Sequence, residues 1–210
     1  MFHLDEIGVF RAKPLTAEQW LEHGFGSRLS DSWPQGGEVV SLKQIHSDIA
    51  LEARECAGCI GEGDALITAQ PGLLLTIRTA DCIPVLIADP VRRAVAAIHA
   101  GWRGAAAGIA GKTVKRMTLS FSSDPADLIA AIGPGIGVCC FEVGPEVAAR
   151  FGTSAKHVDL MEANRMDLVS AGVTRIVVGS PCTVCQPGLF HSFRKDKTQG
   201  RMVSAIGVRE

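Results

Sequence analysis

The chain has 210 residues, of which 47% are hydrophobic and 20% charged, and its formal net charge is −1. This composition excludes a disordered chain and predicts one globular domain over residues 1–210. The near-neutral charge disfavours a nucleic-acid binder, and no apolar run is long enough to cross a membrane.

The N-terminal part of the chain shows few regular patterns. Residues 1–13 carry acids and lack a continuous apolar stretch, so they do not resemble a signal peptide, and we expect a cytoplasmic protein with reduced cysteines. Thr16 can cap a short helix that begins with residues 17–19. Residues 23–28 resemble a glycine-bearing turn, and residues 56–64 an irregular segment. Strands are expected over residues 38–42 and 65–68.

Three short apolar runs in the middle of the chain, at 73–78, 83–88 and 94–99, predict strands buried on both faces. Two interruptions stand out. Asp81 and Cys82 lie between the first two runs, and His99 ends the third. Burying a carboxylate, a thiol and an imidazole costs free energy unless they bind one another or a metal. This region is therefore the expected centre of the chemistry.

The second half of the chain alternates irregularly between helical and strand patterns. Helices are expected over residues 103–119, 145–151 and 161–171. Strands are expected over residues 127–132, 175–178 and 202–206. The order predicts an α/β (α+β) fold with mixed central β-sheets flanked by helices, rather than a doubly wound sheet.

A metal centre is one interpretation of the polar residues near the strand ends. His46, Cys82 and His99 each lie at a strand end or in an adjoining loop, and imidazole and thiolate are good zinc ligands. A catalytic zinc site has three such protein ligands and one open position. The residue types alone leave an ordinary alternative, because histidines are often hydrogen-bonded core residues and buried cysteines are small hydrophobes.

Several motifs along the chain support the interpretation as a metal centre. With them, the chain resembles the bacterial YfiH-type proteins, also described as multicopper polyphenol oxidase or laccase-domain proteins. The most specific are Thr79-Ala80-Asp81-Cys82 and His99-Ala100-Gly101-Trp102-Arg103-Gly104. The others are His23-Gly24-Phe25 with Arg28, Gln44-Ile45-His46, Asp64-Ala65-Leu66, Ala131-Ile132-Gly133-Pro134, Cys140-Phe141-Glu142-Val143-Gly144 and Cys182-Thr183.

The resemblance implies a CNF1/YfiH-like fold and a zinc ion held by His46, Cys82 and His99, with copper as the other candidate metal. It implies phosphorolysis of adenosine, inosine and methylthioadenosine, with adenosine deamination as a further activity and a link to peptidoglycan editing. The expected partners are a small-molecule nucleoside and phosphate, without nucleic acid or membrane, and the expected state is a monomer or weak homodimer. Departures from the family pattern lie mostly in the tail: Phe141, Phe193, Lys195 and Gln199.

Each proposed role has an ordinary alternative. Asp81, like Cys82 and His99, is a candidate catalytic residue. It could carry protons, or it could only cap a turn. Arg103, at a predicted helix start, could bind phosphate or be a surface residue. Arg28 and Arg78 are weaker phosphate candidates. By resemblance, the substrate-binding candidates are His23, Arg28 and Cys140, which could equally be ordinary turn or core residues.

Three other functions remain open. A copper phenol oxidase needs a blue-copper centre and a trinuclear cluster with many more imidazoles, and six histidines disfavour it. A cysteine hydrolase could use Cys82 activated by His99, for example on cell-wall peptides. A non-catalytic protein with a structural metal is the third.

Two CxxC pairs, Cys56/Cys59 and Cys182/Cys185, also need an interpretation. Together they could form a four-cysteine structural zinc site, although the gap between them far exceeds that of a zinc ribbon. A redox role is disfavoured because neither pair opens a helix after a strand.

Overall fold

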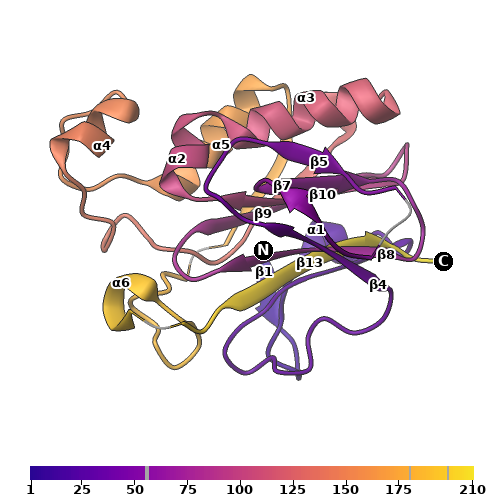
Figure 1. Cartoon of the computed structure of the whole chain (residues 1–210), viewed down its shortest axis with the longest axis horizontal. Helices are drawn as coiled ribbons and strands as arrows, with labels where there is room; N and C mark the ends of the chain where they lie inside the picture. Colours follow the sequence, from indigo (N-terminus) through magenta and orange to yellow (C-terminus); the bar gives the residue numbers. More distant parts are fainter. Residues whose placement is uncertain (55–56, 180, 198) are drawn as a thin grey trace.

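Two β-sheets pack face to face, and helices cover the outer face of one of them, which gives three layers (Figure 1). The computed structural model describes residues 1–54, 57–179, 181–197 and 199–210. The mixed α/β architecture expected from the sequence is confirmed. None of the helices in these ranges is long and apolar enough to span a bilayer.

The seven-stranded sheet has the order β1-β2-β3-β13-β8-β4-β6. Its β4 pairs in parallel with β8 and β6, and the other pairs are antiparallel. The bounds are β1 Phe2–Leu4, β2 Phe10–Ala12, β3 Leu21–Phe25, β4 Glu38–Lys43, β6 Gly58–Glu62, β8 Leu73–Thr79 and β13 Met202–Val208.

The six-stranded sheet has the order β12-β11-β9-β10-β7-β5. Its outer pairs, β11 with β12 and β5 with β7, are parallel, and its inner pairs are antiparallel. The bounds are β5 Ala50–Glu52, β7 Ala65–Thr68, β9 Ile83–Asp89, β10 Ala94–Ala100, β11 Ile129–Ile132 and β12 Arg175–Val178.

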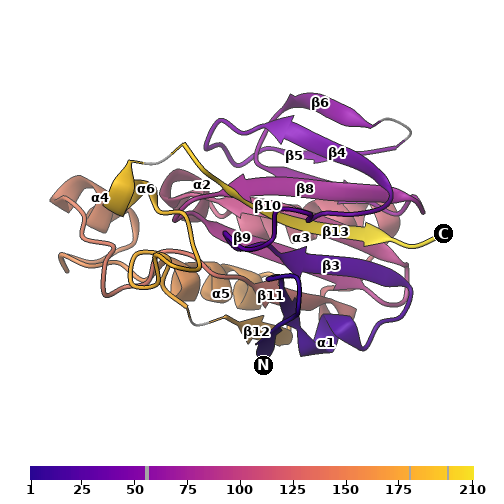
Figure 2. The same ribbon diagram turned by 90° about the horizontal axis from the view of Figure 1, so that it is seen from below.

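The helices α3 and α5 pack on the six-stranded sheet, whereas α4 and α6 lie at the end of the molecule away from the C-terminus (Figure 1, Figure 2). The bounds are α1 Lys13–Thr16, α2 Trp102–Ala106, α3 Ile109–Phe121, α4 Pro145–Arg150, α5 Leu160–Ser170 and α6 Phe193–Asp196. A 3₁₀ turn, Pro125–Asp127, precedes β11.

The central strands β9 and β10 are buried on both faces, as their apolar runs predict. Along β9, Val85 and Ile87 contribute to the core beneath the helices, while Leu86 and Ala88 contribute to the core between the sheets. This alternation follows the two-residue period of a strand. The rigid double core holds the strand ends in place, and the polar interruptions at Asp81, Cys82 and His99 lie at those ends.

Several expected elements were wrong. The helix expected over 103–119 is two helices, because Gly108 adopts the left-handed conformation (φ 74°) between α2 and α3. Thr16 ends a helix rather than starting one, since Pro14 occupies the first turn. The turn expected at 23–28 is partly β3. The irregular segment expected at 56–64 contains β6, and Cys56 lies outside the described residues.

Candidate functional site

The structure brings His46, Cys82 and His99 together from three separate segments. His46 follows β4, Cys82 directly precedes β9, and His99 lies near the end of β10. The three ligand atoms all lie within 4.8 Å of one another. The Cys82 Sγ is 4.0 Å from His46 Nε2, and the two imidazole rings meet edge to face with centroids 5.0 Å apart. This spacing matches a three-ligand metal centre.

Asp64, directly before β7, anchors the loop that carries His46. Its carboxylate accepts hydrogen bonds from the backbone N–H groups of Ile45 (3.3 Å), His46 (3.1 Å) and Ser47 (2.5 Å), and from the Ser47 hydroxyl (2.7 Å). These bonds hold His46 in the left-handed conformation, with φ of 60°. The buried carboxylate therefore fixes where the exposed imidazole points.

The same carboxylate also orients His99. Asp64 Oδ1 lies 2.7 Å from His99 Nδ1, and the backbone N–H of His99 donates to the Asp64 carbonyl at 2.7 Å. Because Nδ1 is engaged, Nε2 is the nitrogen left to face the cluster. Burial raises the pKa of Asp64, but hydrogen bonds from His99 and Ser47 have the larger opposite effect and bring it down to about 2. A carboxylate behind a ligating histidine is a common second layer of metal sites.

The electrostatics of the cluster favour a charged thiol. Burial raises the pKa of Cys82, but the neighbouring His46 and His99 lower it more, to about 6. Burial lowers the pKa of His99, whereas Asp64 and the Cys82 thiolate raise it more strongly. In the absence of a metal these shifts favour a thiolate beside an imidazolium, and the thiolate is the form of Cys82 that binds a metal.

Gly101 leaves the space that the cluster needs. A Cβ at this position would lie 2.8 Å from His46 Cδ2 and 3.3 Å from Cys82 Sγ. Any larger residue would push into the two ligands. The glycine that ends the buried strand thus has a steric reason, since the backbone passes directly against the candidate centre.

A cleft of about 810 Å³ opens over the cluster, and its lining includes Phe193 and Arg194 of α6. Figure 2 shows α6 at the end of the molecule away from the C-terminus. The lining of the cleft combines the cluster with cations and apolar side chains. The cations are Arg78, Arg194, Lys197 and Arg201. The apolar side chains are Leu42, Ala80, Ile136, Phe141 and Phe193. Such a mixture suits a small ligand with an anionic group and a flat apolar part.

Two cations of the cleft are positioned by neighbouring groups. The side-chain amide of Gln44 donates to the backbone carbonyl of Arg78 at 2.8 Å. The backbone N–H of Arg78 donates to the side-chain oxygen of Gln44, also at 2.8 Å. Arg194 donates to the Glu142 carbonyl at 3.0 Å and lies 5.5 Å above the ring of Phe141. The backbone of Arg78 and the guanidinium of Arg194 are thereby held in place.

Asp81 binds the segments that form one wall of the cleft. Its Oδ1 accepts from the Thr183 hydroxyl (2.7 Å), and its Oδ2 accepts from the Ser192 hydroxyl (3.2 Å) and the Arg194 backbone N–H (2.6 Å). The residue is buried, with a φ of 86°. With both oxygens engaged, its geometry fits a positioning role.

Four other sequence candidates do not belong to the cleft lining described by the structure. His23 Nε2 accepts from the Ala12 backbone N–H at 3.1 Å, and Arg28 donates to the Pro187 carbonyl at 2.7 Å. Arg103 is exposed and lies 4.4 Å over the ring of Trp102. The thiol of Cys140 lies near other cysteines. Their roles in substrate binding or catalysis stay predictions.

The sequence reasoning missed Asp64 and most of the cations. Asp64 had a readable signal, because it is an acid placed directly before a buried strand. Arg194, Lys197 and Arg201 come from the tail, and no local pattern shows that the tail folds back over Cys82. Arg78 was considered only as a weaker candidate.

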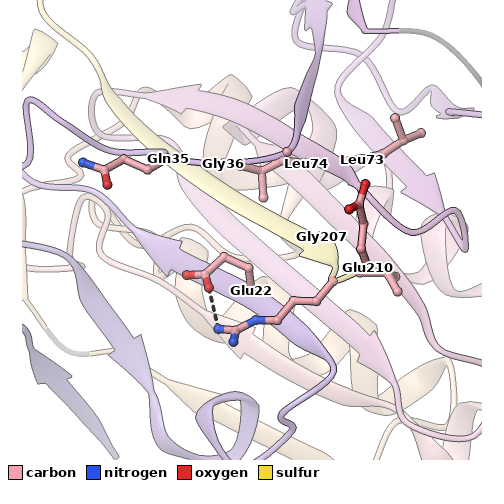
Figure 3. Close-up of a pocket in the computed structure, with 11 residues that line it drawn as sticks. Glu22, Gln35, Gly36, Leu73, Leu74, Gly207 and Glu210 are labelled. Carbon is pink, nitrogen blue, oxygen red and sulfur yellow. Dashed lines mark hydrogen bonds and ion pairs between the residues drawn. The ribbon is translucent and has the colours of Figure 1, made fainter.

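A second cavity, of about 350 Å³, lies near the end of β13 (Figure 3). Its lining includes Glu22 and Arg209, joined by an ion pair of 2.6 Å. No imidazole or thiol belongs to its described lining. The ligand cluster therefore places the candidate chemistry in the larger cleft.

Two relatives of this chain share a name. A protein of Deinococcus radiodurans called purine nucleoside phosphorylase is 40% identical over 183 residues, covering 81% of this chain and 70% of that protein. A protein of the same name from Bacteroides thetaiotaomicron is 40% identical over 165 residues, covering 70% of this chain and 61% of that protein. The chain thus aligns with less than two thirds of the second relative.

The crystal structure of the hypothetical protein YfiH of Bacillus licheniformis superposes with a TM-score of 0.89 at 28% identity, covering 99% of both chains. The resemblance read from the motifs is thereby confirmed. A model of the multi-copper polyphenol oxidoreductase laccase family matches residues 27–209, and the chain belongs to this family.

Proposed function

We propose that this protein is a zinc-dependent purine nucleoside phosphorylase. The observation that carries the proposal is the cleft, in which a His46–Cys82–His99 cluster lies among four cationic and five apolar side chains. The names of the relatives point the same way. Adenosine, inosine and methylthioadenosine are the proposed substrates, with adenosine deamination as a further activity.

The donor set fits zinc. Two imidazoles and a thiolate are good zinc ligands, three protein ligands leave an open position, and Asp64 supplies the second layer behind His99. A metal ion held there would supply Lewis-acid chemistry to a substrate in the cleft. Copper could bind the same donors. However, all six histidines lie in the described residues and only two join a ligand cluster, so a trinuclear copper centre lacks its imidazoles.

Phosphorolysis breaks the bond between the ribose C1′ and the purine nitrogen. A phosphate oxygen bonds to C1′, the electron pair of the broken bond goes to the purine, and the purine takes up a proton. The chain's own residues bind and orient the phosphate and the nucleoside. The guanidinium groups of Arg78, Arg194 and Arg201 suit phosphate, because each can donate two parallel hydrogen bonds. Phe141 and Phe193 offer flat apolar surfaces for the base.

The test is a nucleoside panel read by chromatography with and without phosphate. The proposal expects inosine to yield hypoxanthine and ribose 1-phosphate only when phosphate is present. Adenosine converted to inosine without phosphate would identify the deaminase activity. The variant His46→Ala should lose both activities, while Asp127→Asn, an exposed change away from the cleft lining, should keep them. Fully zinc-loaded protein without any product would refute the proposal.

A cysteine hydrolase is the second candidate, because Cys82, His99 and Asp64 form a chain of thiolate, imidazolium and carboxylate. In this function the Cys82 thiolate attacks the carbonyl carbon of an amide, as in a peptide of the cell wall. The C–N bond breaks as the His99 imidazolium protonates the leaving amine, and water then hydrolyses the thioester. Metal-free protein that hydrolyses such peptides and is inactivated by iodoacetamide would favour it. Turnover that depends on added zinc would count against it.

A further inference from the structure

Four cysteines outside the candidate active centre form a second cluster. They are Cys139, Cys140, Cys182 and Cys185. All four sulfur atoms lie within 4.8 Å of one another. No ligand of the His46–Cys82–His99 centre belongs to this set, and the function proposed above does not use it.

The sheet topology explains how these cysteines meet. The strands β11 and β12 are parallel neighbours, so the loops at their carboxyl ends emerge at the same edge of the sheet. Cys139 and Cys140 lie in the loop after β11, and Cys182 and Cys185 lie in the loop after β12. A bridge between Gly135 and Cys182 joins the two loops.

This arrangement corrects the pairing that the sequence offered for the two CxxC motifs. Cys182 and Cys185 meet the adjacent pair at 139–140, and Cys59 is not part of this cluster. Cys59 belongs to β6, the edge strand of the other sheet, and its thiol contacts the Gly61 carbonyl at 3.8 Å. Cys56 lies outside the described residues.

The distances between the sulfur atoms match a tetrahedral metal site. The thiol of Cys185 is 3.7 Å from that of Cys139 and 3.5 Å from that of Cys140. Four sulfurs at the usual zinc–sulfur distance of about 2.3 Å form a tetrahedron with edges of about 3.8 Å. A disulfide needs about 2.05 Å. The thiols are therefore spaced as the ligands of one ion rather than as bonded pairs.

The backbone around Cys182 is arranged as in thiolate metal sites. The N–H of Gly137 donates to Cys182 Sγ at 3.2 Å. A Cβ on Gly137 would lie 3.1 Å from Cys182 Cβ and 3.2 Å from Cys139 Sγ. The glycine thus lets the loop approach the sulfurs closely, and its N–H can stabilise a negative thiolate.

We propose that Cys139, Cys140, Cys182 and Cys185 bind a second zinc ion, which has a structural role. Four thiolates leave no open position, and closed four-cysteine sets are typical of structural zinc. The ion would close a loop from Cys140 to Cys182 that contains α4, α5 and β12.

The second ion would also brace the cleft. Phe141, directly after Cys140, lines the cleft. Thr183, directly after Cys182, donates its hydroxyl to Asp81 at 2.7 Å, and Asp81 precedes the ligand Cys82. The four-cysteine site therefore fixes one wall of the cleft at two points.

Metal analysis of protein purified in reducing buffer tests the proposal without measuring any turnover. We expect two zinc ions per chain in the unchanged protein and one in His46→Ala. Cys185→Ser should hold one, and His46→Ala combined with Cys185→Ser none. The matched control Cys59→Ser should hold two, since this exposed thiol lies outside both clusters. Absence of zinc from His46→Ala would overturn the second site, as would iron in its place.

Two measurements need no cysteine variant. X-ray absorption at the zinc edge of His46→Ala should show four sulfur neighbours at about 2.3 Å. Alkylation with iodoacetamide, read by mass spectrometry on the unchanged protein, should spare the four clustered thiols until a chelator is added, while Cys59 reacts at once. Nitrogen neighbours around zinc, free reaction of the four thiols, or disulfides among them would overturn the proposal. The outcome does not depend on whether the protein acts on nucleosides.

Discussion

Asp64 and His99 are joined by a 2.7 Å contact between a carboxylate oxygen and the imidazole Nδ1. Because the same carboxylate binds the backbone on both sides of His46, one buried acid positions two of the three candidate ligands. This arrangement gives the ligand cluster a rigid frame before any ion binds. The fold itself thus orients the two imidazoles.

The variant Asp64→Asn tests that frame. The amide cannot serve as acceptor to His99 and all three loop N–H groups at once, so we expect zinc affinity at the cluster to fall about 10- to 100-fold. Chelator competition measures the affinity. The control is Asp48→Asn, because Asp48 belongs to the same loop but pairs with Lys112 at the surface. Equal affinities in the two variants would contradict the positioning role.

Gly101→Ala tests the space at the cluster. The added Cβ would lie 2.8 Å from His46 Cδ2, and overpacking of this kind costs about 1–3 kcal/mol. If that cost acts on the bound geometry, zinc binds about 5- to 150-fold more weakly. Gly188→Ala is the control, since nothing lies within 4 Å of its added Cβ. Isothermal titration with zinc compares them, and unchanged binding in Gly101→Ala would show that the ligands do not need this space.

How far the sequence predicted these features depended on the range of the interactions. The strands β9 and β10 were predictable because burial on both faces leaves an unbroken apolar run. The short strand β3 was missed because His23 and Gly24 obscure its pattern, and its place in the sheet comes from pairing with the distant β13. Local pattern cannot report such a partner.

The same distinction holds at the site. His46, Cys82 and His99 could be nominated from residue type and from their places at strand ends. The cations Arg194 and Arg201 could not, because they reach the cleft only through long-range contacts of the tail with Asp81 and β8. Arg103, the phosphate candidate beside glycines, stacks on Trp102 at the surface, and its role stays a prediction.

Asp81→Asn separates positioning from proton transfer. The amide can accept from Thr183 but cannot accept both bonds at the other oxygen, so the segment carrying Arg194 should loosen. We expect KM for the nucleoside to rise about tenfold, the effect of losing roughly 1.4 kcal/mol, with kcat less affected. A general acid or base would instead contribute about 10²- to 10⁴-fold to kcat and would alter its pH profile. The control is Asp196→Asn, an exposed change in α6.

Because His23 is buried in its neutral form, we expect the free energy of unfolding to fall in acid. Burial, followed by the nearby Arg11, lowers the pKa of His23 to about 3, and its Nε2 accepts a backbone hydrogen bond from Ala12. The unfolded chain takes up a proton near its ordinary pKa of about 6.5, whereas the folded protein does not until about 3. The stability that depends on neutral His23 is therefore present above pH 6.5 and is lost as the pH falls toward 3. Between pH 7 and pH 5 the loss is roughly 2 kcal/mol.

The variant His23→Gln keeps an acceptor for Ala12 but cannot titrate. Urea unfolding at pH 7 and pH 5 should show a decrease in unfolding free energy that is about 2 kcal/mol smaller in the variant than in the unchanged protein. Any effect of metal loss at pH 5 is common to both proteins and cancels in this difference. His157→Gln is the control, because His157 is exposed and is not among the groups that shift the pKa of His23. An unchanged acid sensitivity in His23→Gln would mean that His23 already takes up its proton in the folded state.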